Sequence, residues 1–244
     1  GIGYFSLSFV MATAIGPYLA FTMLEYVDYQ MLFLLVFTVV LIASVFTIFI
    51  KTDNETIDLT KEPKPKFQFV DRDALPAAST ILIICLAHST IFSFIALYAD
   101  EQGLGTAAGY FFLVNAIVML VTRPFTGRLM DRKGANIIVY PALVVLFAAY
   151  LVLGNAQSGW MLLLAGGLIG LGYGNFQSII QALCIKLAEP KNVGLATSTF
   201  FICLDFGLGV GSYIFGQLVP FIGYGGLYNS MTIIVVISAV LYYI

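Results

Sequence analysis

The chain is divided into long apolar runs that short polar turns separate. A bilayer core about 30 Å thick needs roughly 20 apolar residues in each spanning helix. Membrane strands instead alternate apolar and polar positions over about ten residues, and these runs are apolar on all sides. The pattern therefore predicts an all-α membrane protein with eight transmembrane helices. They are expected at about 4–24, 31–50, 75–98, 107–126, 136–153, 160–184, 195–219 and 227–244.

The polar segments predict how these helices are grouped. Short turns are expected at 154–157 and 223–226, whereas residues 51–74 form a long, charged segment that contains proline. Such a composition is typical of a solvated linker. We therefore expect three parts: two helices in 1–50, a linker in 51–74 and a six-helix bundle in 75–244.

Composition excludes several classes of protein. Hydrophobic residues make up 60% of the chain and charged residues 10%, against about 25% charged in soluble domains. A soluble enzyme, a disordered tail and a nucleic-acid-binding module are therefore excluded, and the sequence has no P-loop pattern. Cys85, Cys184 and Cys203 lie in apolar runs with the spacing of neither a disulfide framework nor a metal site. We expect no enzyme activity, no cofactor and no metal.

The basic residues predict the orientation in the membrane. All 11 Lys and Arg residues lie in the segments 51–72, 123–133 and 186–191. The charged residues in the alternate connections are all acidic: Glu25, Asp28, Asp100 and Glu101. Basic loops face the cytoplasm in membrane proteins. The charge pattern thus predicts a multi-pass protein of the cell membrane whose basic loops are cytoplasmic.

An octapeptide from Gly127 to Gly134 connects the fourth and fifth predicted helices. It places one acid, Asp131, among cations, and the sequence predicts a tight turn there. Asp131 can pair with Arg128 or Arg132, or lie at a helix N-terminus. The alternative interpretation is a basic loop that only determines orientation.

This octapeptide resembles the G-x-L-a-D-R-x-G signature of the major facilitator superfamily. The signature lies between the second and third helices of each six-helix half, which is its place here when helices are counted from the linker. The resemblance implies alternating access by two six-helix bundles, of which this chain would hold the last two helices of the first and all of the second. Four more helices are expected upstream. It also implies that Gly127, Arg128, Asp131, Arg132 and Gly134 form a conformational gate, although Ala135–Asn136 replace the family's further basic residues.

The first predicted helix carries small residues at regular spacing. Gly3 is followed by Ala12, Gly16 and Ala20, of which the last three make one smooth face, and Pro17 removes a backbone donor. The pattern resembles the superfamily's antiporter motif, G-x8-G-x3-G-P-x2-G-G, with alanine for two of its glycines and Phe21 at the place of the last one, and it favours export over uptake. The alternative is an ordinary close-packing helix.

Asp205 is the one acid inside a predicted span, in a stretch that resembles the drug/proton antiporter branch. A charge near mid-membrane costs about 2.5–3.5 kcal/mol, and such residues are functional candidates by default. Asp205 is therefore a proton-coupling candidate; a structural acid paired with another helix is the alternative. Gly209 and Ser212 share its face, whereas Gly207 and Gly211 point away and should pack against a neighbour.

Other polar residues lie within the spans. His88, the single histidine, is near the middle of the third span, and imidazole titrates near pH 6.5. It is a second proton-coupling candidate, although a lone buried histidine is more often structural. Asn115, Gln177 and Gln181 suit either a cavity lining or interhelical hydrogen bonds, and the sequence leaves both open.

By resemblance, the function is proton-coupled export of a small amphipathic molecule. The expected partners are that substrate, protons and the lipid bilayer, with no nucleic acid, and the full-length protein is expected to be monomeric. Two alternatives stay open: a proton-coupled importer of a sugar or organic acid, and a non-transporting scaffold or sensor on the same fold.

Overall fold

A computed structural model describes residues 12, 15–24, 26–49 and 69–244 of the chain. The chain divides into two compact units, with the division near Tyr18 and Phe69. The predicted linker at 51–74 falls largely outside the described residues. The predicted grouping into 1–50, 51–74 and 75–244 stays a prediction.

The smaller unit contains helix α2, Tyr29–Ile48, and most of the short apolar helix Ile15–Leu24. The 20 residues of α2 span about 30 Å at 1.5 Å per residue, which matches the bilayer core. None of its side chains is buried within the described residues, and the helix is apolar all round. An apolar surface of this kind is suited to contact with lipid or with other membrane helices.

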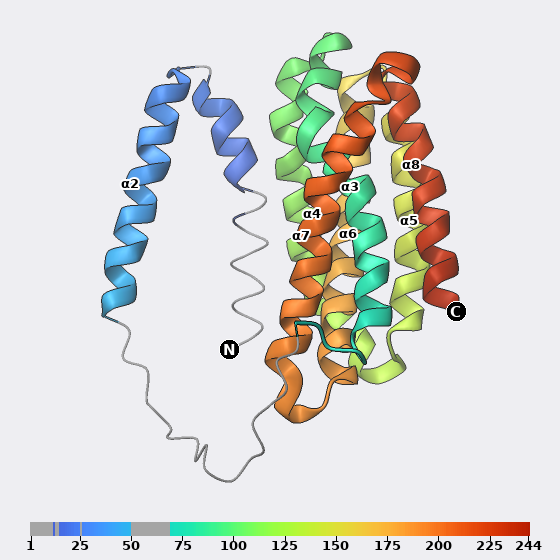
Figure 1. Ribbon diagram of the computed structural model, residues 1–244. Coiled ribbons are helices and arrows are strands. Elements are labelled where there is room, and N and C mark those ends of the chain that lie inside the picture. The colour runs from blue at the N-terminus through green and yellow to red at the C-terminus, as the bar shows by residue number, and fades with distance from the viewer. Residues whose placement is uncertain (1–11, 13–14, 25, 50–68) are drawn as a thin grey trace. The chain divides into compact units, whose positions relative to one another are not determined.

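The larger unit is a bundle of long helices that run side by side (Figure 1). Its helices are α3 Leu75–Glu101, α4 Gly105–Lys133, α5 Asn136–Gly154, α6 Gly159–Leu187, α7 Val193–Gly216 and α8 Val219–Tyr243, with a short 3₁₀ turn, Pro190–Asn192, before α7. The described residues contain seven helices long and apolar enough to cross a membrane, and no strand. The predicted all-α membrane bundle is confirmed.

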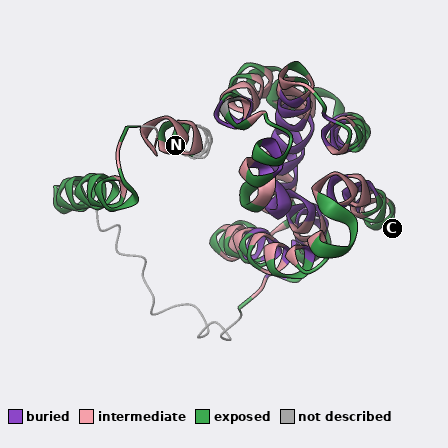
Figure 2. Ribbon diagram, turned by 90° about the horizontal axis from the view of Figure 1, so that it is seen from above, coloured by how far each residue is buried: buried purple, intermediate pink, exposed green. Residues whose placement is uncertain are grey.

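The core of this bundle lies along α3 and α6, which carry the longest series of buried residues. Figure 2 shows the buried segments in the interior of the bundle and the exposed ones around it. Large side chains such as Tyr150, Phe176 and Tyr228 are completely enclosed. The three cysteines are buried free thiols. Polar side chains on α3 and α6 therefore point into the bundle, where each needs a partner or a function.

Two glycines on α7 allow it to lie directly against α3. A Cβ atom added at Gly207 would be 2.6 Å from the carbonyl oxygen of Leu82, and one at Gly211 would be 2.6 Å from that of Leu86. Both distances are too short for any side chain. The prediction that these glycines pack against a neighbour is confirmed, and their absent side chains are what lets the two backbones approach.

The predicted turn across the octapeptide is wrong. Helix α4 continues through it to Lys133, and only Gly134, with φ of 87°, leaves the helical conformation. Arg132 and Lys133 lie in the last helical turn, where cations interact favourably with the helix dipole. The apolar run ends where the membrane is expected to end, but the helix does not, because charged residues form helix as readily as apolar ones.

The predicted turn at 223–226 is also wrong. Helix α7 ends at Gly216, and α8 already begins at Val219. Within α8, Gly223 has φ of 66° and ψ of 174°, so that the helix is broken at one residue and then resumes. Glycine adopts this conformation without steric cost, which explains why a glycine-rich stretch produces a kink rather than a loop.

Candidate functional site

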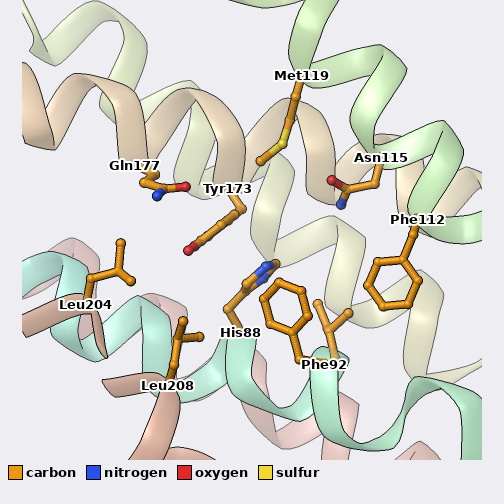
Figure 3. Close-up of a pocket in the computed structure, with 10 residues that line it drawn as sticks. His88, Phe92, Phe112, Asn115, Met119, Tyr173, Gln177, Leu204 and Leu208 are labelled. Carbon is orange, nitrogen blue, oxygen red and sulfur yellow. The ribbon is translucent and has the colours of Figure 1, made fainter. Parts of the chain in front are cut away.

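A recess in the bundle is formed by α3, α4, α6 and α7 around His88 (Figure 3). Its volume is about 60 Å³. Since one water needs roughly 15 Å³ on this scale, it has room for about four. The polar and aromatic lining is His88, Phe92, Phe112, Asn115, Tyr173 and Gln177. The apolar remainder is Ile91, Met119, Leu204 and Leu208.

Aromatic rings form one wall of the recess. The imidazole of His88 is stacked on the ring of Tyr173, with 3.5 Å between centroids and 10° between planes. Phe92 meets His88 edge-on at 5.1 Å and lies nearly parallel to Phe112 at 6.0 Å. The hydroxyl of Tyr173 is also 3.6 Å from the thiol sulfur of Cys85. Because Tyr173 is held at both its face and its hydroxyl, it is a rigid platform for His88.

Three polar side chains of the recess, those of His88, Asn115 and Gln177, lack hydrogen bonds in the part of the chain that the structure describes. His88 is 4% exposed and its Nδ1 atom is fully buried without a partner. Gln177 is 8% exposed and also forms none with the described residues, and neither does the half-buried Asn115. A buried polar group without a partner is destabilising by about 1–3 kcal/mol. One such atom, His88 Nδ1, beside two amide side chains that have no hydrogen bond to a described residue therefore favours a ligand-binding role for the recess over a structural one.

The structure places the predicted cavity residues in different surroundings. Asn115 and Gln177 line the recess, whereas Gln181, one turn further along α6, does not. Gly209 is exposed on α7. Ser212 accepts a 2.8 Å hydrogen bond from the hydroxyl of Ser93 on α3, so it links two helices.

The aromatic lining was not among the residues predicted from the sequence. Helical spacing contains the signal that would have found it, because residues three or four apart share a helix face. Phe92 follows His88 by four positions, Tyr173 precedes Gln177 by four, and Phe112 precedes Asn115 by three. Each missed aromatic side chain is thus one turn from a polar residue that the sequence does single out.

Asp205 lies halfway along α7 and outside the recess lining. It is the thirteenth of 24 residues in the helix and is exposed, with no hydrogen bond or ion pair to any described residue. The side chain is therefore on an exposed part of α7, from which its charge still acts on Cys85 of α3 and Tyr173 of α6. This is the setting of an acid that is available to protons or to another part of the transporter, although its role stays a prediction.

The octapeptide residues are at the C-terminal end of α4. Gly127, Arg128, Asp131, Arg132 and Gly134 are all exposed. The expected pairing of Asp131 with Arg128 or Arg132 is not found among the described residues, whereas Lys191 and Glu189 form an ion pair at 3.0 Å.

The small-residue motif of the first predicted helix is only partly described. Gly3 lies outside the described residues, whereas Gly16, Pro17 and Ala20 belong to the helix Ile15–Leu24, and Ala12 is a single described residue before it. A Cβ atom at Gly16 would meet no described atom within 4 Å. The antiporter-like role of this motif stays a prediction.

A sequence profile of the Major Facilitator Superfamily matches residues 1–159. The protein belongs to the major facilitator superfamily. The match includes the octapeptide and the part of α4 that lines the recess. The family resemblance inferred from the motifs is thereby confirmed, and the protein is a multi-pass membrane protein of a transporter family.

Known members of the superfamily resemble the chain at low identity. It is 21% identical over 251 residues, 98% of this chain and 62% of the relative, to the multi-drug resistance efflux pump PmrA homolog of Lactococcus lactis subsp. lactis strain IL1403. It is 28% identical over 160 residues, 63% of this chain and 38% of the relative, to the multidrug resistance protein MdtG of Proteus mirabilis strain HI4320. An uncharacterized MFS-type transporter of Methanocaldococcus jannaschii is 21% identical over 254 residues, 100% of this chain and 65% of the relative. The chain thus spans less than two thirds of the length of these relatives.

Proposed function

We propose that this superfamily member is a secondary active transporter that exports a small amphipathic molecule in exchange for protons. In the proposal, the bundle described above is one of two that rock around a central site, so that the site opens to each side of the membrane in turn. The basic loops face the cytoplasm of the cell membrane, and residues 1–50 belong to the other bundle. The relative named as a multi-drug resistance efflux pump supports export.

The observation that carries this proposal is the recess around His88. It combines aromatic walls with polar side chains that have no hydrogen-bond partner among the described residues. Ligand sites are mostly apolar with a few placed polar groups, and an amphipathic molecule offers both kinds of surface. A bundle built only for stability would pair these groups or replace them with apolar ones.

Coupling to protons is assigned to Asp205, with His88 as the second candidate. Asp205 is at mid-helix and exposed, so it is accessible to protons while far from both ends of α7. In the proposed cycle it takes up a proton from the outside and releases it to the cytoplasm, while the octapeptide with Asp131 closes the cytoplasmic end. One proton that moves down a 100 mV potential supplies about 2.3 kcal/mol.

Everted membrane vesicles that contain the full-length protein test the proposal. A panel of neutral and cationic aromatic dyes is added outside, and the vesicle lumen is then acidified. An exporter that exchanges protons for substrate accumulates dye in the lumen, and a protonophore abolishes the accumulation. A proton-coupled importer instead drives dye out of the lumen, and a scaffold or sensor produces no gradient-dependent flux. Either of these two results would overturn the proposal.

The same vesicles test the assignment of Asp205. We expect Asp205→Asn to lower uphill accumulation at least tenfold while downhill exchange of dye persists, because asparagine preserves shape and hydrogen bonding but carries no titrating proton. Glu101→Gln, at the end of α3, is the matched control and should transport normally. Uphill accumulation by Asp205→Asn at the normal rate would make Asp205 a structural acid and leave His88 as the candidate.

A further inference from the structure

We propose that the recess around His88 seats an uncharged, planar aromatic ring that carries hydrogen-bonding atoms on its edge. The inference rests on the proposed transport function and names the class of substrate that this bundle recognises. It concerns the part of the ligand that enters the recess. Four properties of the recess carry it: flat walls, unpaired polar groups, absence of fixed charge, and small volume.

The walls of the recess favour a flat ligand. His88 and Tyr173 lie within 10° of parallel, Phe92 and Phe112 within 16°, and the two pairs meet at nearly a right angle through His88 and Phe92. These are the offset and edge-to-face arrangements that aromatic rings prefer. A further ring can extend such an array, whereas a branched or globular group cannot lie flat against it.

The polar groups of the recess require a ligand with polar edge atoms. Gln177 and His88 are both more than nine-tenths buried, and neither side chain has a hydrogen bond to a described residue. Asn115 adds a second amide on the opposite helix, as Figure 3 shows. Each amide offers two N–H donors and one oxygen acceptor. A ring with an acceptor nitrogen and a donor amine on its edge satisfies groups that a plain hydrocarbon leaves unpaired.

The charge of the recess favours an uncharged ligand. No Asp, Glu, Lys or Arg is among the described residues that line it. Asp205 acts electrostatically on Tyr173 but does not line the recess, so it offers no direct contact to a ligand there. A cation that enters would lose its hydration without gaining a carboxylate partner. Attraction of a cation to ring faces is limited here, because the faces of His88 and Tyr173 cover each other.

The volume of the recess sets the size of the ligand. At about 60 Å³ it is smaller than the cavity of about 150 Å³ that holds benzene in a protein core. A ring therefore enters edge first, with movement of the side chains that can give way. Phe92 is 44% exposed, and Met119 has a flexible thioether chain. Movement of these two side chains is what the inference requires before the recess can hold a planar ring.

A neutral and a cationic probe with the same fused ring test the inference. The neutral probe is 3-aminoquinoline, and the cationic probe is its N-methylated quinolinium salt, which has a fixed charge and whose methylated ring nitrogen no longer accepts a hydrogen bond. Binding to the full-length protein in detergent is measured by equilibrium dialysis at pH 8. We expect the neutral ring to bind roughly tenfold tighter, about the value of one desolvated polar interaction. Equal or tighter binding of the cation would overturn the inference.

Two variants locate the binding. Gln177→Leu should weaken binding of 3-aminoquinoline roughly tenfold, whereas Gln181→Leu, on the same helix but outside the recess, should leave it unchanged. Equal effects of both variants would overturn the assignment. The probe pair needs no variant, so the inference stays testable if Gln177→Leu fails to fold. Dye transport in vesicles is measured separately from binding. If the protein transports dye but does not bind the neutral probe more tightly than the cationic one, this inference alone is refuted. If it binds 3-aminoquinoline with that preference but transports no dye, the proposed function alone is refuted.

Discussion

Two asparagines in the bundle show the same side chain in opposite settings. Asn175 on α6 is 3% exposed and fully engaged: its amide nitrogen donates to the carbonyl oxygen of Leu171 at 2.7 Å and to the hydroxyl of Thr122 at 3.3 Å, and its oxygen accepts from the hydroxyl of Thr126 at 3.0 Å. Asn115 on α4 lines the recess and has no hydrogen bond to any described residue. Asn175 thus joins α6 to α4, whereas Asn115 faces the recess.

The difference between Asn175 and Asn115 separates the two roles that a polar residue can have inside a membrane bundle. A paired amide contributes to helix association, on average about 0.6 kcal/mol for each interhelical bond. An unpaired amide makes no such interhelical bond, and its burial lowers the stability of the folded protein. Its presence beside aromatic walls is consistent with a ligand as its missing partner. Stability and binding should therefore respond in opposite ways to mutation of these two residues.

The largest effect on stability is expected from Asn175→Leu. The substitution removes the hydrogen bonds to Thr122 and Thr126 and leaves two hydroxyls to bond only within α4. We expect the free energy of unfolding to fall by about 1–2 kcal/mol. At roughly 2–4 °C per kcal/mol for a chain of this size, the thermal unfolding midpoint in detergent should fall by several degrees.

Ser178→Ala is the matched control for Asn175→Leu. Ser178 is on the same helix, but its hydroxyl bonds only to the carbonyl oxygen of Gly174 within that helix. Its loss should leave the midpoint unchanged. An Asn175→Leu protein as stable as the Ser178→Ala protein would show that the network does not join the helices.

The sequence predicts most of this fold, because the bilayer imposes a length and an apolar composition that can be read directly from the chain. The predicted runs at 75–98, 136–153 and 160–184 each fall within three residues of a helix in the structure. The errors lie where helices leave the apolar region. The end of α4 at Lys133 and the kink at Gly223 depend on backbone conformation, to which hydropathy is insensitive.

The candidate site is much less predictable than the fold. Asn115, Asn175 and Gln177 are all amides within apolar runs, and nothing in the sequence separates the paired one from the others. Pairing depends on which residue of another helix lies opposite, as Thr126 does for Asn175. That information arises from helix rotation and packing rather than from local pattern. The aromatic platform of Tyr173 under His88 is hidden for the same reason.

A smaller effect is expected from Thr126→Val, which removes one side of the same network. Valine has nearly the shape of threonine, so packing is preserved while the 3.0 Å bond to the Asn175 oxygen is lost. The bond from Asn175 to Thr122 remains. The unfolding free energy should fall by about 0.6 kcal/mol, about half of the loss in Asn175→Leu. The double variant Asn175→Leu/Thr126→Val should be no less stable than Asn175→Leu alone, because both substitutions remove the same hydrogen bond between Thr126 and Asn175. If the losses of the two single variants instead add in the double variant, they do not act through that bond.

The smallest effect on stability is expected from Asn115→Leu, and it completes the comparison. No hydrogen bond to a described residue is lost, and a polar group that lacked a partner is replaced by an apolar one of similar volume. The thermal midpoint should therefore stay the same or rise slightly. Binding of 3-aminoquinoline should nevertheless weaken, because one of the two amides that face the recess is gone. A clear fall in the midpoint would show that Asn115 has a structural partner after all, and the contrast with Asn175 would then fail. Unchanged stability with weaker binding is the result that only a ligand-facing amide produces.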